Sequence, residues 1–412
     1  MLKEARKGLK CRHCGSMLPL EPFLYLCPKC SRNLEYIYDY QVIGDNWTKH
    51  DIAQDPEPSI WRYSPLIPVD GTPVNRSLRV GSTPLVSIPQ GANAVGIGEL
   101  FIKDDSRNPS GSLKDRASEV AIQHAREQGK STIVAASTGN AGSSLAALTA
   151  HHGLRSVIFV PAAAPEAKLA QIRQHGAHLI ALDTNYDTAF DLAFAVAEKM
   201  GLYSRNTGIN PVLAEGKKTV SFEIAEQLNW KAPDHVFVPM GDGCIISGVY
   251  KGFYDLKALG WIESMPRIHG VQAEGSSAIV DNLHSEDQIK AINASTVADS
   301  INVNMPRDGE KARHAILASG GSGIRVKDEE ILNAQNEMSQ SYGIFGEPAA
   351  SAAFAGFQIA AGAGLFEGNE TVVVLNTGSG LKDIRAAQQQ LAPIKIYSTD
   401  LQVLNREIRE LI

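Results

Sequence analysis

Hydrophobic and polar positions follow a repeating order along the chain from residue 80 onward. Short apolar runs rich in β-branched residues are followed by Gly- or Ser-rich turns and then by helical stretches. We predict strands in five such runs, at residues 131–137, 155–161, 235–241, 267–275 and 371–378. Strands that alternate with helices form parallel sheets with helices on both faces, and ligands bind in the loops at the carboxyl ends of the strands. The pattern therefore predicts an α/β fold and places the chemistry in those loops.

The length and charge of the chain narrow its class. At 412 residues it exceeds the size at which a single core keeps growing, so we expect two or more domains. It carries 39 Lys plus Arg and 45 Asp plus Glu, a formal charge of −6, which argues against general binding to nucleic acid or anionic membranes and favours small-molecule partners. No apolar run approaches the roughly 20 residues of a membrane span, and the charged N-terminus lacks the apolar segment of a secretory signal. We expect a soluble cytoplasmic protein.

Four of the five cysteines lie within the first thirty residues, as two Cys-x-x-Cys pairs with twelve residues between them. Each pair can turn its thiolates toward a common point, and four sulfurs satisfy tetrahedral zinc. Two disulfides are the alternative, which a reducing cytosol disfavours. A segment this short cannot build its own core, so the metal would supply its folding energy. We predict a zinc ribbon over residues 1–45, with Cys11, Cys14, Cys27 and Cys30 as the ligands and His13 as a bystander.

The role of this ribbon has two interpretations. Zinc ribbons often bind nucleic acid, and the extreme N-terminus is basic. However, the ribbon continues into residues 34–40 and 59–69, where aromatic residues alternate as in segments that pack on a neighbouring domain. We expect a structural or capping role, with nucleic-acid binding as the alternative. The basic residues are Lys3, Arg6, Lys7, Lys10 and Arg12.

Three strand-to-helix loops have the composition of anion-binding turns. In the first two, unpaired backbone N–H groups at a helix start can hold a carboxylate or phosphate, although a simple capping turn also explains the first. Asp242 and Ile245 would repel or crowd an anion in the second loop unless they turn outward. In the third, Thr377 places a hydroxyl beneath any ring in the cleft, with a plain turn as the alternative. The first loop is Ser137, Thr138, Gly139 and Asn140, and the second is Gly241, Asp242, Gly243, Cys244 and Ile245.

Lys114 follows a string of small turn-forming residues, 108–113, and directly precedes charges that open a helix. An amine that attacks an aldehyde must be partly deprotonated, which requires a desolvated pocket with cationic neighbours or a cofactor beside it. Taken alone, a lysine in such a segment is a surface residue. The three anion-binding loops elsewhere favour instead a covalent anchor for an aldehyde cofactor.

Taken together, the segments NPSGSLKDR, ASTGNAG, GDGCIISG and NTGSGLKD resemble, in that order, those of the pyridoxal phosphate enzymes of fold type II. Among these, the chain is most similar to the threonine synthase family, some members of which carry a zinc ribbon, and the similarity spans nearly the whole sequence. The resemblance implies two parallel-sheet domains behind the ribbon. The large cofactor domain comprises residues 46–109 and 215–412 and ends in a helical tail, and the small domain comprises residues 110–214. Relatives also suggest a homodimer.

The resemblance assigns roles to the loop residues. Lys114 would bind the aldehyde of pyridoxal 5'-phosphate and then move protons at the α and β carbons of the substrate. Asn140 would contact the 3' oxygen of the cofactor, and the N–H groups of residues 137–140 would hold the carboxylate of an amino-acid substrate. The backbone of residues 241–245 would hold the cofactor phosphate. Thr377 would face the pyridine nitrogen, and because its neutral hydroxyl does not keep that nitrogen protonated, elimination and replacement are favoured over transamination.

The resemblance implies conversion of phosphohomoserine and water to threonine and phosphate, but one segment departs from the family. Where the family has an arginine that helps bind the substrate phosphate, this chain has Leu213. A dianionic leaving group needs charge-assisted donors, and Lys217, Lys218 or Arg107 are candidate substitutes. Residues 295–307 are also similar to a segment of serine and threonine dehydratases. Dehydration of threonine or serine, or β-replacement on phosphoserine as in cysteate synthase, stays an alternative.

Glu347 lies in a further acidic segment, before an Ala-rich helix. A carboxylate in the first turn of a helix interacts favourably with the helix dipole, which explains this residue without any contact to a cofactor. We therefore leave Glu347 out of the predicted catalytic residues.

Overall fold

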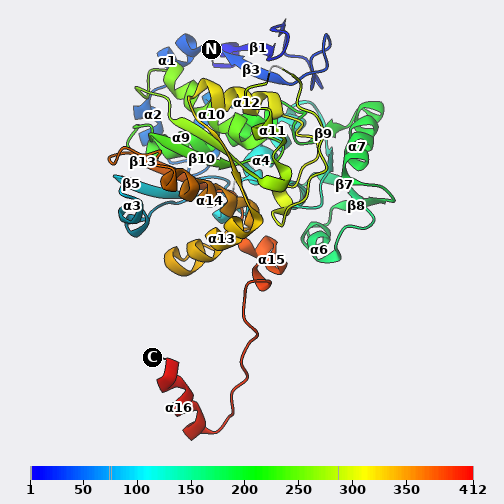
Figure 1. The fold of residues 1–412 in the computed structure, drawn as a ribbon. Helices are drawn as coiled ribbons and strands as arrows, with labels where there is room; N and C mark the ends of the chain where they lie inside the picture. Colours follow the sequence, from blue (N-terminus) through cyan, green and yellow to red (C-terminus); the bar gives the residue numbers. More distant parts are fainter. Residues whose placement is uncertain (1, 74, 76, 286, 412) are drawn as a thin grey trace.

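The computed structural model describes residues 2–73, 75, 77–285 and 287–411. Its strands form three sheets, and helices surround the two larger ones (Figure 1). Among the described residues, no helix has the length and apolar character needed to cross a membrane.

The largest sheet has six strands in the order β12-β11-β10-β13-β5-β4, and all neighbours are parallel except β4 and β5. Two of its strands precede the smaller sheet in the sequence and four follow it, so distant parts of the chain meet here. Val236 and Val238 pack in one apolar cluster and Phe237 in another, so the sheet is buried on both faces. The strands are β4 (Leu85–Ser87), β5 (Glu99–Asp104), β10 (His235–Pro239), β11 (Arg267–Ala273), β12 (Gly323–Val326) and β13 (Thr371–Asn376).

Helices cover both faces of this sheet, α13 and α14 on one and α10 and α12 on the other. The α-helices that lie before residue 114 or between residues 218 and 363 are α1 (Tyr40–Asn46), α2 (Lys49–Gln54), α3 (Pro89–Val95), α9 (Thr219–Gln227), α10 (Cys244–Ala258), α11 (Ala278–Asp281), α12 (Gly309–Ala318), α13 (Asp328–Tyr342) and α14 (Pro348–Gly362). Short 3₁₀ helices occur at Leu2–Ala5, Ile60–Leu66, Asp105–Arg107, Glu274–Ser276, Asp299–Ile301 and Gly380–Lys382.

The smaller sheet has four parallel strands in the order β8-β7-β6-β9. Ile133 packs in one apolar cluster and Val134 in another, so this sheet is also buried on both faces. The elements are α4 (Lys114–Glu127), β6 (Thr132–Ala136), α5 (Asn140–His152), β7 (Arg155–Pro161), α6 (Glu166–Gln174), β8 (His178–Leu182), α7 (Tyr186–Met200), β9 (Tyr203–Ser204) and α8 (Val212–Lys217). The prediction of an α/β fold with parallel sheets is confirmed, and each of the five predicted strand runs contains a strand.

The N-terminal segment forms a small antiparallel sheet of β1 (Arg6–Cys11), β2 (Met17–Leu18) and β3 (Leu34–Tyr38). Its aromatic residues pack on the body of the protein. The hydroxyl of Tyr25 accepts a hydrogen bond from the N–H of Ser204 (3.0 Å), and the hydroxyl of Tyr38 donates to Glu215 (2.7 Å). The segment is therefore docked against the end of β9 and against α8.

The C-terminal segment, which the sequence predicted as a helical tail, is helical in two separate parts. It forms two short helices, α15 (Ile384–Gln388) and α16 (Leu401–Leu411), joined by an extended stretch that carries α16 away from the body (Figure 1). Pro393 lies in this stretch. Proline lacks an N–H and disfavours helical geometry in the residue before it, which explains the interruption.

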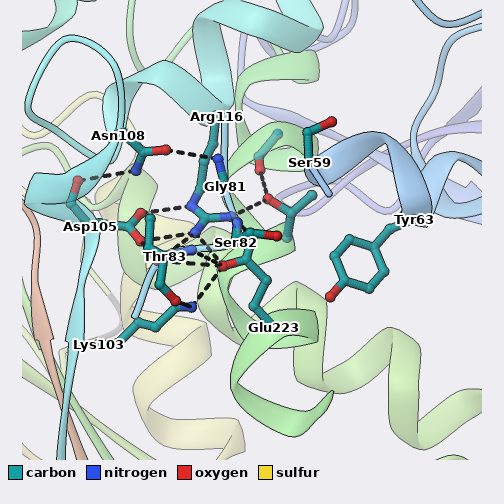
Figure 2. Close-up of polar contacts among 12 residues, drawn as sticks. Ser59, Tyr63, Gly81, Ser82, Thr83, Lys103, Asp105, Asn108, Arg116 and Glu223 are labelled. Atoms are coloured by element: carbon teal, nitrogen blue, oxygen red, sulfur yellow. Dashed lines mark hydrogen bonds and ion pairs between the residues drawn. The ribbon is translucent and has the colours of Figure 1, made fainter. Parts of the chain in front are cut away.

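A buried network of two cations and two carboxylates fixes the start of α4 (Figure 2). Arg116 donates to Asp105 through Nε (2.7 Å) and to Glu223 through Nη1 (2.6 Å) and Nη2 (2.8 Å). The Nζ of Lys103 donates to the same carboxylate of Glu223 (2.7 Å). The hydroxyl of Thr83 donates to Asp105 (2.6 Å). The network therefore joins α4, the end of β5 and α9.

Charge balance explains how this network is tolerated in the interior. Although burial raises the pKa of Glu223, the charges of Arg116 and Lys103 hold it well below its ordinary value. Burying a charge is costly unless it is paired and hydrogen-bonded, and here each charge faces an opposite one. Removing one member would leave another uncompensated.

We expect Arg116→Met to lower the free energy of unfolding by about 3–5 kcal/mol, because it strands the buried carboxylates of Asp105 and Glu223. The matched control is Arg173→Gln, which breaks the exposed pair of Arg173 with Glu166 and should change stability little, since water screens such pairs. Denaturant unfolding followed by circular dichroism measures both. Equal midpoints for the two variants would contradict the role of the network.

Candidate active site

The loop that precedes α4 is held against the loop that follows β13. The N–H of Leu113 donates to the carbonyl of Thr377 (2.9 Å), and the N–H of Ser379 donates to that of Gly111 (3.0 Å). Gly111 has a φ of +81°, which disfavours other residues at this turn. These backbone bonds place Lys114, the first residue of α4, next to Thr377.

The amine of Lys114 has an environment suited to nucleophilic chemistry. Burial lowers its pKa to about 8, and the positive charges of Lys217 and Arg205 add to the effect, while the carboxylate of Glu347 opposes it. At pH 7 a pKa of about 8 leaves about a tenth of the amine unprotonated, far more than for an ordinary lysine, and attack on an aldehyde requires that form.

The first predicted anion loop lies at the start of α5, directly after β6. The N–H of Gly139 donates to the hydroxyl of Ser137 (3.2 Å), and the N–H of Ser143 makes the first helical bond to the carbonyl of Gly139 (3.1 Å). The N–H groups of the first turn have no partner within a helix, so they are available to an anion. A Cβ on Gly139 would meet no atom within 4 Å, so the backbone here borders open space.

Glu347 is a site residue that the sequence interpretation missed. It is 4% exposed, and its carboxylate accepts a hydrogen bond from the Nδ2 of Asn140 (2.7 Å) and one from the hydroxyl of Ser300 (3.2 Å). Burial raises its pKa above the ordinary value. Although Glu347 directly precedes α14, its side chain makes no capping hydrogen bond, so the helix-dipole explanation did not capture its contacts.

The second predicted anion loop lies at the start of α10. Gly243 has a φ of +89°, and a Cβ on Gly241 would come within 2.9 Å of Val303, so both positions require glycine. Asp242 accepts a hydrogen bond from the N–H of Arg307 (3.3 Å), and burial raises its pKa to about 6. Burial raises the pKa of Cys244 to about 12, so its thiol stays protonated. A carboxyl with a pKa of about 6 is still mostly ionised at neutral pH, so Asp242 keeps most of its negative charge.

These loops meet around one cavity of about 410 Å³, a size typical of small-molecule and cofactor sites. The cavity lies where β6 of the smaller sheet and β10 and β13 of the larger one end. Residues 293–294 and 299–304 line another side of the cavity. In the sequence, residues 295–307 stand out only by their similarity to a segment of dehydratases. All eleven predicted cofactor and substrate residues line it: Lys114, Ser137, Thr138, Gly139, Asn140, Gly241, Asp242, Gly243, Cys244, Ile245 and Thr377.

The candidate substitutes for the missing arginine lie in different places. Leu213 is buried in the apolar core. Arg107 is exposed and Lys217 is buried, and neither of these two cations lines the cavity. Lys218 is occupied, because its Nζ contacts Glu215 and lies 2.7 Å from Asp255.

The four N-terminal cysteines also come together. The Sγ atoms of Cys11, Cys14, Cys27 and Cys30 all lie within 4.8 Å of one another. Tetrahedral zinc with Zn–S bonds of about 2.3 Å requires sulfurs about 3.8 Å apart. The arrangement therefore suits one four-coordinate metal ion.

Comparison with known proteins identifies the family. Residues 76–378 match the family of pyridoxal-phosphate dependent enzymes. The chain is 37% identical over 409 residues to a threonine synthase of Methanocaldococcus jannaschii, covering 98% of this chain and 99% of the relative. It is 39% identical over 380 residues to a threonine synthase of Methanosarcina acetivorans, covering 91% and 92% of the two chains.

Solved structures share the fold at lower identity. The processed form of threonine deaminase isoform 2 from Solanum lycopersicum aligns with a TM-score of 0.65 at 23% identity, over 74% of this chain and 86% of the other. A fungal L-serine ammonia-lyase from Rhizomucor miehei aligns with a TM-score of 0.66 at 22% identity, over 75% and 97%. With the family match and the nearly full-length relatives, they show that the chain belongs to the pyridoxal-phosphate dependent enzymes of fold type II, and within them to the threonine synthase family.

Proposed function

We propose that this chain converts O-phosphohomoserine and water to threonine and inorganic phosphate. The observation that carries the proposal is the cavity in which Lys114 lies with two helix N-termini and Thr377. Nearly full-length similarity to threonine synthases supports the choice of substrate.

The cavity residues fit pyridoxal phosphate. The amine of Lys114, with its pKa lowered to about 8, suits attachment to the aldehyde. The N-terminal turn of α10 and residues 241–245 suit the phosphate, since backbone N–H groups and the helix dipole favour an anion there. The Nδ2 of Asn140 donates to Glu347 (2.7 Å) and to the hydroxyl of Ser300 (3.3 Å), so contact with the 3' oxygen would replace the longer bond to Ser300. When bound, the cofactor supplies an electron sink for negative charge at the substrate carbons.

The chain's own groups would then direct the reaction. Residues 137–140 would bind the substrate carboxylate and orient the α carbon. The N–H of Ser137 already donates to the carbonyl of Phe159 (3.2 Å) and that of Gly139 to the hydroxyl of Ser137 (3.2 Å), so Thr138 and Asn140 would supply the free N–H groups. Lys114, once free of the aldehyde, takes and returns protons at the α and β carbons, which needs a base within hydrogen-bond reach. The hydroxyl of Thr377 would face the pyridine nitrogen and, being neutral, would not supply the negative charge that keeps this nitrogen protonated, which would favour elimination and replacement. Movement of residues 110–214 toward residues 46–109 and 215–412 would exclude water until it is needed.

We also propose that zinc occupies the four-cysteine cluster and that the ribbon is structural. Four of its five basic residues form ion pairs: Lys3 and Arg6 contact Asp70, Lys7 lies 3.1 Å from Asp39, and Arg12 lies 3.0 Å from Glu35. These ion pairs leave less positive charge available to nucleic acid.

We further infer a cytoplasmic homodimer. Clustered free cysteines suit a reducing compartment. Leu401 and Ile408 of α16 are 71% and 50% exposed, and apolar side chains presented in this way are commonly covered in an assembly.

Purified enzyme given phosphohomoserine should release phosphate and threonine in equal amounts. Lys114→Ala should lower the rate by about 10²–10⁴-fold, because proton transfer at the substrate carbons loses its base. Lys199→Ala, which removes an exposed lysine of α7, is the control and should match wild type. Formation of 2-oxobutanoate from threonine, with no phosphate release from phosphohomoserine, would instead identify a dehydratase.

One zinc ion per chain is expected in the purified protein. Cys27→Ser should lose the metal and lower the melting temperature, because the ribbon depends on it for folding. Cys244→Ser alters the cysteine outside the cluster and should retain zinc. Inductively coupled plasma mass spectrometry and thermal denaturation measure the two effects. Equal zinc contents in both variants would contradict the assignment.

A further inference from the structure

Most buried cations discussed above have carboxylate partners. Arg116 and Lys103 share Glu223, and Lys218 lies 2.7 Å from Asp255. This pairing is the expected pattern, because an isolated buried charge is costly. Any buried cation without a carboxylate partner therefore requires an explanation.

Arg205 and Lys217 depart from this pattern. Both are 0% exposed, and within residues 2–73, 75, 77–285 and 287–411 neither forms an ion pair. The Nη2 of Arg205 and the Nζ of Lys217 also have no hydrogen-bond partner in that part of the chain. Two unpaired cations in one interior indicate that an anion from outside the chain completes the site.

Neither side chain lines the cavity itself, but each contacts or packs against a segment that does. Arg205 directly follows β9, and its Nη1 donates to the hydroxyl of Thr207 (2.8 Å), a residue that lines the cavity. Lys217 is the last residue of α8. A Cβ placed on Gly248, a residue of α10, would come within 2.8 Å of the Cβ of Lys217. Lys217 is thus packed closely against α10, whose first residue, Cys244, lines the cavity.

The electrostatics agree with this placement. Burial is the main cause that lowers the pKa of Lys217, and the charge of Arg205 lowers it further. Both cations also help to lower the pKa of Lys114. Of the nearby carboxylates, Asp308 already lies 3.0 Å from the ammonium of Lys311. Two buried cations near Lys114 therefore lack a carboxylate partner, although the carboxylates of Asp187, Asp242, Asp299 and Glu347 line the cavity itself.

We propose that Arg205 and Lys217 bind the phosphate of the amino-acid substrate and stabilise it as a dianionic leaving group. This inference rests on the proposed function and names the residues that select its phosphorylated substrate. The cofactor phosphate has donors of its own at the start of α10. A second phosphate needs charge-assisted donors, which Leu213 cannot supply. Arg205 and Lys217 provide them from two neighbouring segments.

The test compares holoenzymes of wild type, Arg205→Gln and Lys217→Gln. Each variant should bind inorganic phosphate about 10- to 100-fold more weakly and raise the KM for phosphohomoserine similarly, because a charge-assisted hydrogen bond is lost. Cofactor affinity, followed by visible absorbance, should change by less than about 3-fold. Arg307→Gln is the matched control, because Arg307 forms ion pairs with two carboxylates of its own, Asp187, which lines the cavity, and Asp191. It should bind phosphate as wild type does.

Calorimetry with inorganic phosphate requires no turnover, so its outcome is separate from the proposed function. Failure of wild type to release phosphate from phosphohomoserine would reject the proposed function. The calorimetric phosphate affinities would still test whether Arg205 and Lys217 bind phosphate. Arg205→Lys and Lys217→Arg keep the charge and should recover part of the affinity, which a purely structural role would not predict. Unchanged phosphate affinity in the Gln variants would overturn the inference. A loss of cofactor affinity as large as that of phosphate affinity would overturn it too.

Discussion

The ion network around Arg116 is the constraint on which the site depends. Its guanidinium joins Asp105, at the end of β5, to Glu223 of α9, and it lies two residues after Lys114. Because these charges are buried and mutually paired, α4 cannot rotate or slide without stranding one of them. The same helix start is tied by backbone bonds to the loop that carries Thr377. The backbone of Lys114 is thus held by the buried ion network outside the cavity and by the loop that carries Thr377.

The buried charges fall into two groups, those that are paired around Arg116 and those that lack a partner near the cavity. Around Arg116 each charge is matched, so the region is neutral and rigid. Near the cavity, Arg205 and Lys217 lack a carboxylate partner, so each adds positive potential at Lys114. That potential lowers the pKa of Lys114 and attracts anions, and two phosphate groups are what the proposed reaction brings there. One arrangement of charge therefore serves both the nucleophile and the substrate.

Much of the fold and part of the site could be predicted from the sequence, because both depend on local patterns. Alternating apolar runs and small-residue loops located the parallel strands and the loops at their carboxyl ends, and the Cys-x-x-Cys spacing located the four sulfurs. Glu347 was missed because its helix position has a local explanation, whereas its bond to Asn140 joins residues far apart in the sequence. Arg205 was missed for the same reason, since nothing near it shows that its charge is unpaired. The break in the tail at Pro393 could have been anticipated from that residue alone.

The central claim is that one amine, that of Lys114, carries the cofactor. The most direct measurement is borohydride reduction of the holoenzyme followed by peptide mass mapping, which converts a reversible imine to a stable amine. We expect the added pyridoxyl mass on the peptide that contains Lys114 and on no other. A pyridoxyl group on a different lysine, or an unmodified Lys114 peptide in fully reconstituted enzyme, would contradict the claim.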